Sequence, residues 1–380
     1  MEGTFDVIIA GAGPAGLSAA ETVARRGRAV LVVEQNHEIG SPIRTSGGSF
    51  IDELDNLGIR ADLYHQISRV RFLSRTKRAV FEYPQPILCV LDVRRVFQFL
   101  AERACAAGAQ IRLGTVVDGP LIKDGFVAGV RTRDQTDAAK IVIDATGYRS
   151  ALLKQAGLDP GFERFGVGAE YDLFAPHCDQ DEAVLIVGGV APSGYAWVFP
   201  WGHHRVRVGV GIIHPDHRGR PEEFLDHLMD ELPRLGVNLT GAQPIEKHAG
   251  LIPSERFSDR FAGDGILGVG DAAGHASSLL GEGIRWAIYA GRMAGEVAAG
   301  ALDRGDVSRA ALGAFEKKWR KKFGGNLKLA HRINQRIAKW DDATWDRRME
   351  IVKRLPPAQF AEGLKTNLTG GLLWSLLSGR

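Results

Sequence analysis

The sequence predicts an α/β protein, α+β overall, in which a nucleotide-binding unit is interrupted by a second sheet and followed by helices. Two apolar, β-branched runs each enter a glycine-rich turn and then a helix, one at the start of the chain and one after residue 265. Short runs at 111–113, 116–117 and 127–133 predict a small β-meander. Between residues 162 and 251, short strand-like runs dominate, and one helical segment interrupts them. Helical periodicity resumes over residues 310–340, where two adjacent glycines predict a kink or a split.

The first unit is a strand, a glycine turn, a helix and a second strand within residues 5–34. Gly11 permits the tight turn, and Gly13 lets a pyrophosphate approach the backbone. Gly16 lets the helix pack close to the sheet. The pyrophosphate is expected on the free N–H groups at the start of this helix, beside Ala15. The unit is therefore predicted to bind a dinucleotide.

Glu34 ends the second strand of this unit. A carboxylate there can accept hydrogen bonds from both ribose hydroxyls, and it repels a 2′-phosphate. The adenosine bound at this turn is therefore expected to belong to FAD or NAD rather than NADP. The alternative is a glycine turn without a ligand, which would not need an acid at this position.

A second motif, Gly-Val-Gly-Asp-Ala-Ala-Gly, continues the buried run of residues 265–269. It brings Gly270 and Asp271 to a tight turn, where the aspartate of a two-part FAD site accepts a hydrogen bond from the ribityl chain. The helix that follows would direct its N-terminus at the pyrimidine end of the flavin, which is negatively charged when reduced. The residues that open this helix are Gly281, Gly283 and Ile284. An aspartate acting only as a helix cap is the alternative.

Composition excludes several classes of protein. The 380 residues carry a net charge of +3, which does not suggest a nucleic-acid partner. The three cysteines are far apart and form no CxxC pair, so neither a disulfide framework nor an iron–sulfur site is expected. The histidines show no metal-binding spacing, so no metal is predicted. The chain opens directly into a strand, and no apolar run reaches the length of a membrane span. We therefore expect a cytoplasmic protein, peripheral to a membrane at most.

The charge is uneven along the chain. From residue 301 onward there are 17 Lys+Arg against 8 Asp+Glu, a local +9, which leaves about −6 for the first 300 residues. The same region ends in the apolar run 372–377. We expect the segment 315–380 to lie beside the mouth of the pocket and to aid contact with a membrane or a lipid substrate. A solvated basic helical face is the alternative.

Several segments together resemble known flavoenzymes. The first glycine turn, residues 145–150 and residues 270–274 resemble FAD enzymes with the fold of p-hydroxybenzoate hydroxylase. The segments 40–44, 194–200 and 281–285 are similar to the geranylgeranyl reductase family, and the similarity covers about residues 5–330. Members of that family use FAD to reduce isolated double bonds of isoprenoid chains. The resemblance implies an apolar isoprenoid or lipid substrate and an electron donor that is NAD(P)H or ferredoxin-like.

The resemblance also assigns residues. It implies that Arg44 and Gly147 contact FAD. An arginine of the family that contacts FAD at the start of a helix falls on Val93 here, with Arg94 one residue away. The strand with alternating aromatic residues has bulk on one face, which suits a flat flavin and a long apolar substrate. Its members are Tyr195, Trp197 and Phe199, of which the last two are expected to bind substrate.

One departure bears on the chemistry. The family has Cys-Gly in the loop after the second strand, whereas this chain has Thr45-Ser46. A thiol can donate a proton at neutral pH and a threonine hydroxyl cannot do so directly. The candidate catalytic residues are therefore Thr45 relaying a water, Tyr195 and His275, the last within the second flavin motif.

The resulting domain boundaries are expectations. We assign residues 1–68, 90–160 and 255–308 to a discontinuous Rossmann-like FAD-binding domain. We assign residues 69–89 and 161–254 to a substrate-binding domain with a mostly antiparallel sheet. Residues 309–380 form a C-terminal helical region.

The leading hypothesis is an FAD-dependent reductase of carbon–carbon double bonds in an apolar isoprenoid-type substrate. An FAD-dependent monooxygenase, acting as a hydroxylase or an epoxidase on an apolar substrate, could use the same scaffold. A non-catalytic binding protein is a third possibility, although an empty site would not need both Glu34 and Asp271.

Overall fold

The strand–helix–strand unit expected at the start of the chain is confirmed by the computed structural model, which describes residues 4–158 and 161–367. Its elements are β1 (Thr4–Ala10), α1 (Pro14–Ala24) and β2 (Val30–Val33). Strand β1 lies between β2 and a long central strand, parallel to both. The sheet follows the order β17-β18-β11-β1-β2-β8, and both predicted glycine turns lie at the carboxyl ends of its parallel strands. The further strands of this order are β8 (Gln110–Arg112), β11 (Thr136–Asp144), β17 (Ala262–Gly263) and β18 (Ile266–Gly268).

The predicted β-meander needs one correction. The run 111–113 is not part of it, because β8 pairs in parallel with β2 at the edge of the main sheet. The meander instead consists of β9 (Val117–Lys123), β10 (Phe126–Thr132) and β11. The pairing of Val32 with Ile111 places this short strand at the parallel edge of the main sheet, where it is only half-buried. This position explains why it does not join the meander.

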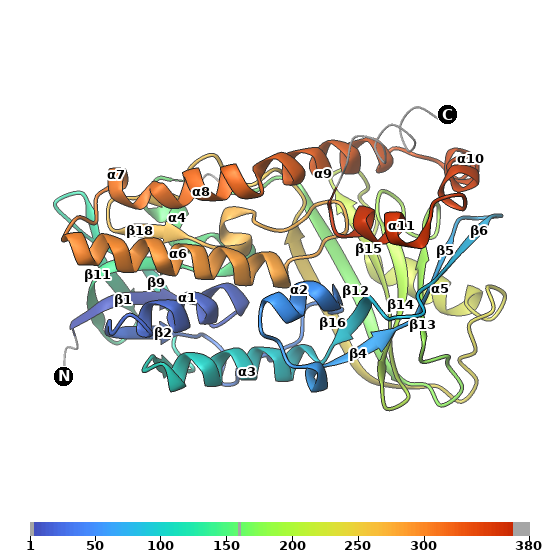
Figure 1. Cartoon of the computed structure of the whole chain (residues 1–380), viewed down its shortest axis with the longest axis horizontal. Coiled ribbons are helices and arrows are strands. Elements are labelled where there is room, and N and C mark those ends of the chain that lie inside the picture. Colours follow the sequence, from blue (N-terminus) through green and yellow to red (C-terminus); the bar gives the residue numbers. More distant parts are fainter. Residues whose placement is uncertain (1–3, 159–160, 368–380) are drawn as a thin grey trace.

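Small residues let two long helices cross closely above the parallel sheet. Helix α6 (Ile284–Arg304) lies against α1, as Figure 1 shows. A Cβ atom at Gly291 would lie 2.1 Å from the carbonyl oxygen of Ala15, and one at Gly295 would lie 3.0 Å from that of Ala19. Since side chains would hold the two backbones apart, glycine at these positions fixes the spacing. Helix α3 (Val93–Ala106) packs on the other side of α1.

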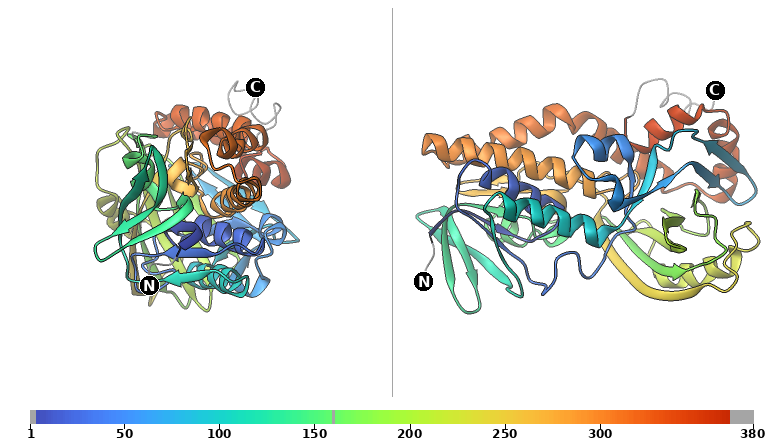
Figure 2. Two further views of the ribbon diagram at one scale, coloured as in Figure 1. Left: turned by 90° about the vertical axis from the view of Figure 1, so that its left-hand side faces the viewer. Right: turned by 60° about the horizontal axis from the view of Figure 1, so that its bottom comes forward.

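The middle of the chain forms a seven-stranded sheet that is antiparallel except for one pair. Its order is β16-β12-β15-β14-β13-β5-β6, and only β13 and β5 run in parallel. Helix α5 (Pro221–Glu231) covers one face, and the other face turns toward the first sheet (Figure 2). The strands are β5 (Arg69–Leu73), β6 (Arg78–Glu82), β12 (Phe165–Phe174), β13 (Glu182–Ile186), β14 (Tyr195–Gly202), β15 (Arg205–His214) and β16 (Gln243–Pro253).

A small antiparallel sheet and four short helices complete the described first half of the chain. The small sheet has the order β3-β7-β4 and adjoins the seven-stranded sheet at β14. These elements are β3 (Gly48–Phe50), α2 (Ile51–Asn56), η1 (Ala61–Leu63), β4 (Tyr64–Ile67), β7 (Leu88–Leu91), η2 (Gly147–Arg149) and α4 (Ala151–Gln155). The division into domains stays a prediction.

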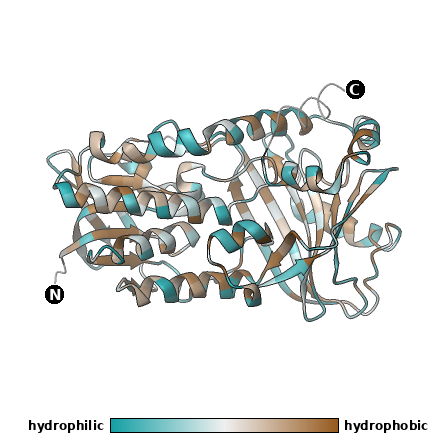
Figure 3. Ribbon diagram, in the orientation of Figure 1, coloured by the Kyte–Doolittle hydropathy of each residue, from teal (hydrophilic) through white to brown (hydrophobic). Residues whose placement is uncertain are grey.

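The C-terminal region is helical, and the split predicted at the glycine pair is confirmed, because one helix ends before Phe323 and the next begins at Gly324. The helices run back over the molecule toward the seven-stranded sheet (Figure 1). They are α7 (Arg309–Leu312), α8 (Ala314–Lys322), α9 (Gly324–Ile337), α10 (Asp342–Val352) and α11 (Pro357–Leu364). Figure 3 shows α8 largely hydrophilic, in contrast to the apolar strands of the parallel sheet. The apolar run 372–377 lies outside the described residues.

Candidate active site

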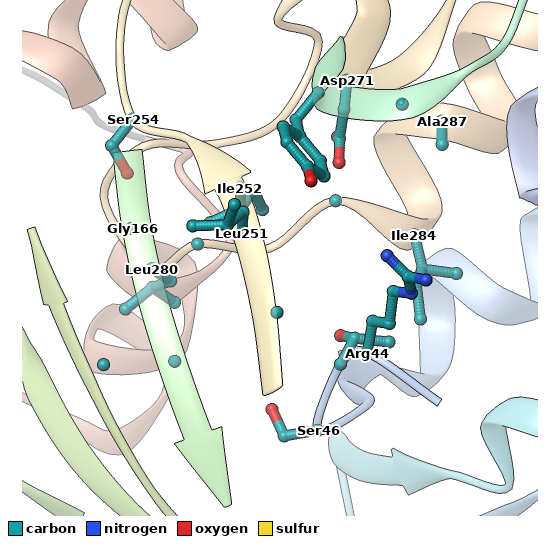
Figure 4. A pocket seen from close by; sticks show the side chains of 18 of the residues that line it. Arg44, Ser46, Gly166, Leu251, Ile252, Ser254, Asp271, Leu280, Ile284 and Ala287 are labelled. Atoms are coloured by element: carbon teal, nitrogen blue, oxygen red, sulfur yellow. The ribbon is translucent and has the colours of Figure 1, made fainter. Parts of the chain in front are cut away.

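One cavity of about 630 Å³ runs between the carboxyl edge of the parallel sheet, the open face of the seven-stranded sheet and helices α9–α11. Its walls differ in character along its length. One end is lined by both glycine turns and by charged side chains, whereas the other end is lined by aliphatic and aromatic side chains. Figure 4 shows Arg44 and Asp271 projecting into the space between β12 and β16 on one side and α6 on the other. The site therefore has a polar half and an apolar half.

The three glycines of the first turn are explained by different structural features. Gly11 has φ +106°, and a Cβ atom there would lie 2.3 Å from the carbonyl oxygen of Ala145. A Cβ at Gly16 would lie 2.1 Å from the carbonyl oxygen of Gly11. A Cβ at Gly13 would meet no atom within 4 Å, although Gly13 lines the cavity. Packing therefore requires two of the glycines, and the third leaves open space where a ligand can reach the backbone.

Helix α1 offers its first turn to this space. No side chain caps it, and Pro14 and Ala15 at its start line the cavity. Free backbone N–H groups at a helix N-terminus bind phosphate. The guanidinium of Arg44 also lines the cavity, is exposed, and pairs with no acid among the described residues. The polar half thus presents positive charge to an anion.

Glu34 lies where the sequence predicts it, in the cavity wall at the end of β2. It is buried, and its Oε2 accepts a hydrogen bond of 2.7 Å from the backbone N–H of Ala12. Its Oε1 accepts two more from Asn36, at 2.9 and 2.7 Å. These donors fix the carboxylate, and Oε2, which accepts only one of them, keeps lone-pair capacity for a ribose hydroxyl.

Asp271 is a carboxylate without a partner. It lines the cavity, and its side chain accepts no hydrogen bond from any residue that the structure describes. Burial raises the pKa of Asp271 to about 6. A carboxylate in this environment needs a donor, and a polyol such as the ribityl chain of FAD would supply it. The open space at Gly13 and the unsatisfied Asp271 both fit FAD.

The turn after β11 is built by a second aspartate. Asp144 is fully buried and accepts hydrogen bonds from Thr146 and from the backbone N–H groups of Leu152 and Leu153. These bonds cap α4 and fix the turn in which Gly147, with φ +71°, lines the cavity. Desolvation raises the pKa of Asp144 even though these donors favour its charged form. Its contribution is structural.

The N-terminus of α6 faces the same cavity. Gly281, Gly283 and Ile284 line it, and no side chain caps the helix. The turn before this helix is stabilised by Arg285. Its side chain pairs with Glu282 at 2.7 Å and donates a hydrogen bond from Nη2 to the carbonyl oxygen of Lys365. The helix end is therefore rigid and open toward the ligand, as expected from the sequence.

A buried arginine fixes the loop that carries Thr45. Arg207 donates from Nη1 to the carbonyl oxygens of Ser46, at 2.8 Å, and Leu91, at 3.0 Å. It also pairs with Asp172, and both side chains are about 1% exposed. Thr45 itself lines both the main cavity and a smaller one of about 80 Å³.

The apolar half has a tryptophan as its floor. Trp197 lies across two glycines of the neighbouring strand β15, since Cβ atoms at Gly209 and Gly211 would lie 2.3 and 3.4 Å from its ring. Aromatic and aliphatic residues close the remaining walls. They are Phe72, Leu185, Val187, Ile333, Ile337, Trp340, Trp345, Val352, Leu355, Phe360 and Leu364. Phe199 lines the smaller cavity next to Thr45.

The structure constrains the predicted proton donors. Tyr195 lines the cavity, but its hydroxyl donates to the carbonyl of Leu280 at 2.6 Å, and burial raises the pKa of Tyr195 well above its ordinary range. His275 is fully buried outside the cavity lining, packed against Phe261 and Trp319. Burial lowers the pKa of His275 to about 3. A catalytic role for His275 does not fit this placement, because its ring packs among aromatic rings and neither it nor they line the cavity.

Arg94 also differs from expectation. Its neighbour Val93 lines the cavity, whereas Arg94 does not. The Arg94 guanidinium lies 3.9 Å from Glu38 and 3.9 Å from Glu246. An FAD contact by Arg94 does not follow from this placement, because α3 presents Val93 to the cavity.

Three charged residues beneath the cavity are not predicted by the sequence motifs, namely Glu170, Arg207 and His248. Glu170 and His248 line it, and Arg207 supports its loop. An alternating pattern in the sequence could have located them. On β12, β15 and β16, charged residues and glycines occupy the alternate positions that share one face of the strand. Among the described residues, no group of three or more His, Cys, Asp or Glu side chains could hold a metal ion.

Comparisons with known proteins agree with this geometry. Residues 4–312 match a family model described as an FAD binding domain. The chain is 33% identical to a digeranylgeranylglycerophospholipid reductase of Methanosarcina acetivorans, over 87% of this chain and 84% of the relative. It is also 33% identical to digeranylgeranylglycerophospholipid reductase 2 of Methanothermobacter thermautotrophicus, over 85% of each chain. A solved geranylgeranyl bacteriochlorophyll reductase-like protein of Thermoplasma acidophilum superposes with a TM-score of 0.88 at 25% identity, covering 99% of this chain and 96% of that chain.

Proposed function

The chain belongs to the FAD-dependent geranylgeranyl reductase family, and we propose that it saturates carbon–carbon double bonds of an isoprenoid lipid. The observation that carries the substrate class is the continuity of the cavity. A polar half that fits FAD opens directly into an apolar half with aromatic walls. A flexible chain of isoprene units can lie in such a space with its reacting bond beside the flavin.

The residues proposed to hold FAD come from four segments. Backbone at the first glycine turn and at the start of α1 receives the pyrophosphate, and Glu34 receives the ribose. Asp271 receives the ribityl chain, and the N-terminus of α6 faces the flavin ring. Reduced FAD supplies two electrons and one of the two hydrogens that an alkene takes up. The full proposed set is Gly11, Gly13, Ala15, Gly16, Glu34, Arg44, Gly147, Gly270, Asp271, Gly281, Gly283 and Ile284.

The chain's own residues supply the environment of the reaction. Trp197 and the aromatic walls exclude water from the apolar half and position the isoprenoid chain. Tyr195 holds the segment that contains Leu280 through its hydroxyl. Thr45 lies at the junction of the two cavities and contacts the substrate without acting as its acid. The second hydrogen must therefore reach the substrate as a proton from another group.

The product tests this proposal. The purified protein, reduced anaerobically with dithionite, is incubated with digeranylgeranyl lipids, and the lipids are analysed by mass spectrometry. We expect each reacted bond to gain one molecule of hydrogen. A product that instead gains an oxygen atom when air is admitted would identify a monooxygenase, and an unchanged lipid under both conditions would refute both activities.

The affinity for FAD is expected to depend on pH through Asp271. Burial sets the pKa of its free carboxyl group at about 6. A ribityl hydroxyl that donates to the carboxylate lowers this pKa, so FAD binds the ionised form more tightly. The Kd, measured by fluorescence titration, should rise as pH falls below about 6, by up to about tenfold per pH unit, and should be flat above it. Asp271→Asn should remove this dependence, and an unchanged pH profile in that variant would contradict the assignment.

We also propose that the outer face of α8 and α9 contacts anionic lipid. The inner face of α9 lines the apolar half of the cavity through Ile333 and Ile337. The outer face exposes basic side chains, none of which pairs with an acid among the described residues. They are Lys317, Lys318, Lys321, Lys322, Lys328, Arg332 and Arg336. No helix within the described residues is long and apolar enough to cross a membrane.

Removing charge from this face should weaken vesicle binding. Each cation near an anionic surface contributes about 1 kcal/mol, or about fivefold in binding. We expect the triple variant Lys317→Gln, Lys321→Gln, Lys328→Gln to lose about a hundredfold in flotation with anionic vesicles. A matched triple variant on the β9–β10 hairpin and its following turn, Lys123→Gln, Arg131→Gln, Arg133→Gln, should bind like the wild type. Equal losses in the two variants would show that only overall charge matters.

The electron donor is proposed to be NAD(P)H or a ferredoxin-like protein. No second nucleotide motif is visible in the sequence. Anaerobic stopped-flow mixing of the oxidised protein with NADH, with NADPH and with a reduced ferredoxin separates the two classes, because only a competent donor bleaches the flavin within the turnover time.

A further inference from the structure

A histidine held between two carboxylates lies at the edge of the cavity. His248 on β16 is 5% exposed. Its Nδ1 lies 2.8 Å from Oε1 of Glu170 on β12, and its Nε2 lies 3.1 Å from Oε2 of Glu246 on its own strand. Glu170 and Glu246 differ in their surroundings, because the side chain of Glu170 is 4% exposed and that of Glu246 is 37% exposed. The three groups form a hydrogen-bonded row from solvent inward.

The inner end of this row reaches the apolar half of the cavity. Glu170 and His248 both line the cavity, and Glu246 does not. The second oxygen of Glu170 accepts a hydrogen bond of 2.9 Å from Nε1 of Trp197, the residue that forms the cavity floor. The carboxylate is therefore held in one orientation, between the imidazole and the space proposed for the substrate.

Other charges around the row belong to neighbouring elements. Arg207 on β15 approaches His248 from the same sheet and pairs with Asp172, which also receives Arg205. Arg94 on α3 lies 3.9 Å from Glu246. Burial lowers the pKa of His248, and Arg207 opposes its charge. The hydrogen bonds to Glu170 and Glu246 outweigh both effects, so the pKa of His248 lies above its ordinary value.

We propose that Glu246, His248 and Glu170 form a relay in which Glu246 stabilises His248 as a cation, and His248 passes its proton through Glu170 to the substrate in the cavity. The inference rests on the proposed reduction of a double bond. That reaction breaks one carbon–carbon π bond and forms two carbon–hydrogen bonds. Reduced FAD supplies both electrons and one hydrogen, so one proton per bond must enter a space that excludes water. None of the donors predicted from the sequence can supply it, since Thr45 is not an acid, Tyr195 is committed to Leu280, and His275 lies elsewhere.

The proton moves in balanced steps. Cationic His248 passes its Nδ1 proton to Glu170, and Glu170 gives that proton to the carbon that did not receive hydrogen from the flavin. The neutral ring keeps its Nε2–H on Glu246. After the product has left, solvent reaches Nδ1 through the cavity that His248 lines and returns a proton to it, which restores the cation. Glu170 is the group that meets the substrate, and the other two residues act through it.

The first test does not depend on turnover. Nitrogen-15 NMR of labelled imidazole in the purified FAD-loaded protein reports the protonation of His248. We expect a cationic ring at neutral pH, and a lower pKa in Glu246→Gln, while the matched exposed variant Glu82→Gln on β6 leaves it unchanged. A neutral ring in the wild type, or a pKa that does not respond to Glu246→Gln, would overturn the relay even if no alkene is reduced.

The second test uses the rate of alkene reduction by the chemically reduced enzyme. Glu170→Gln keeps an acceptor for Trp197 but cannot carry the proton, and we expect about a hundredfold loss with FAD affinity unchanged. Glu246→Ala should lose about tenfold at saturating lipid and should be rescued by formate, which a purely structural role would not allow. Wild-type activity should fall as pH rises through the pKa of His248. Full activity in Glu170→Gln would overturn the proposal, whereas an inactive wild type would overturn the proposed function instead.

Discussion

Gly11→Ala is expected to lower the free energy of unfolding by about 3–5 kcal/mol and to abolish FAD binding. The new Cβ would lie 2.3 Å from the carbonyl oxygen of Ala145 and 2.8 Å from its carbonyl carbon, and both atoms are backbone. Its φ of +106° is also unfavourable for alanine. Because Ala145 begins the turn that contains Gly147, the strain separates the two central strands at the cofactor edge. Chemical denaturation of the FAD-free protein measures the first effect, and a fluorescence titration measures the second.

Gly13→Ala is the informative control. Its Cβ would meet nothing within 4 Å, so the FAD-free protein should unfold like the wild type, as should Gly325→Ala on α9. Gly13 nevertheless lines the cavity, and the added methyl should weaken FAD by about tenfold to a hundredfold, or about 1.4–2.8 kcal/mol. Normal FAD affinity in Gly13→Ala would mean that the pyrophosphate does not lie against this turn.

Arg207→Met is expected to destabilise the protein by about 3 kcal/mol and to remove most of its activity. The substitution removes the fully buried one of the two arginines that pair with Asp172, and it removes the donor to the carbonyls of Ser46 and Leu91. Without that donor, the loop with Thr45 is no longer held against the cavity. Thermal denaturation and the rate of alkene reduction would show both effects.

The matched control is Arg205→Met. Arg205 pairs with the same carboxylate at 2.9 Å, but its side chain is 21% exposed, and none of the loop carbonyls receives a hydrogen bond from it. We expect a loss of at most about 1 kcal/mol and near-normal activity. Similar effects of the two substitutions would show that the charge of Asp172, and not the support of the loop, is what matters.

The amino-acid sequence is sufficient where function depends on local backbone chemistry. Each glycine turn directly follows a buried strand and precedes a helix, which begins at Pro14 after the first turn and at Ile284 after the second. The motifs alone therefore locate Gly11, Glu34 and Asp271, and all three line the cavity. The aromatic strand is also predictable, because alternation places Trp197 on one face whichever strands lie beside it.

Features that depend on pairing between distant strands are not predictable in this way. Glu170 and His248 meet because β12 and β16 pair with Glu170 opposite His248, a register set by the whole sheet. The position of β8 at the edge of the parallel sheet has the same origin. For His275, proximity in sequence is misleading. Its position near Asp271 in the sequence suggests a shared site, but the turn directs its ring into an aromatic cluster.

In the proposed reaction, electrons pass from FAD to an isoprenoid double bond within one continuous cavity. The most direct measurement is a single turnover without oxygen. The FAD-loaded protein is reduced, freed of excess reductant, and mixed in a stopped-flow instrument with a digeranylgeranyl lipid or with its fully saturated counterpart. The absorbance of oxidised flavin should return with the unsaturated lipid, at a rate that matches formation of the reduced bond, and should not return with the saturated one. A flavin that stays reduced in the presence of the unsaturated lipid would contradict this electron transfer.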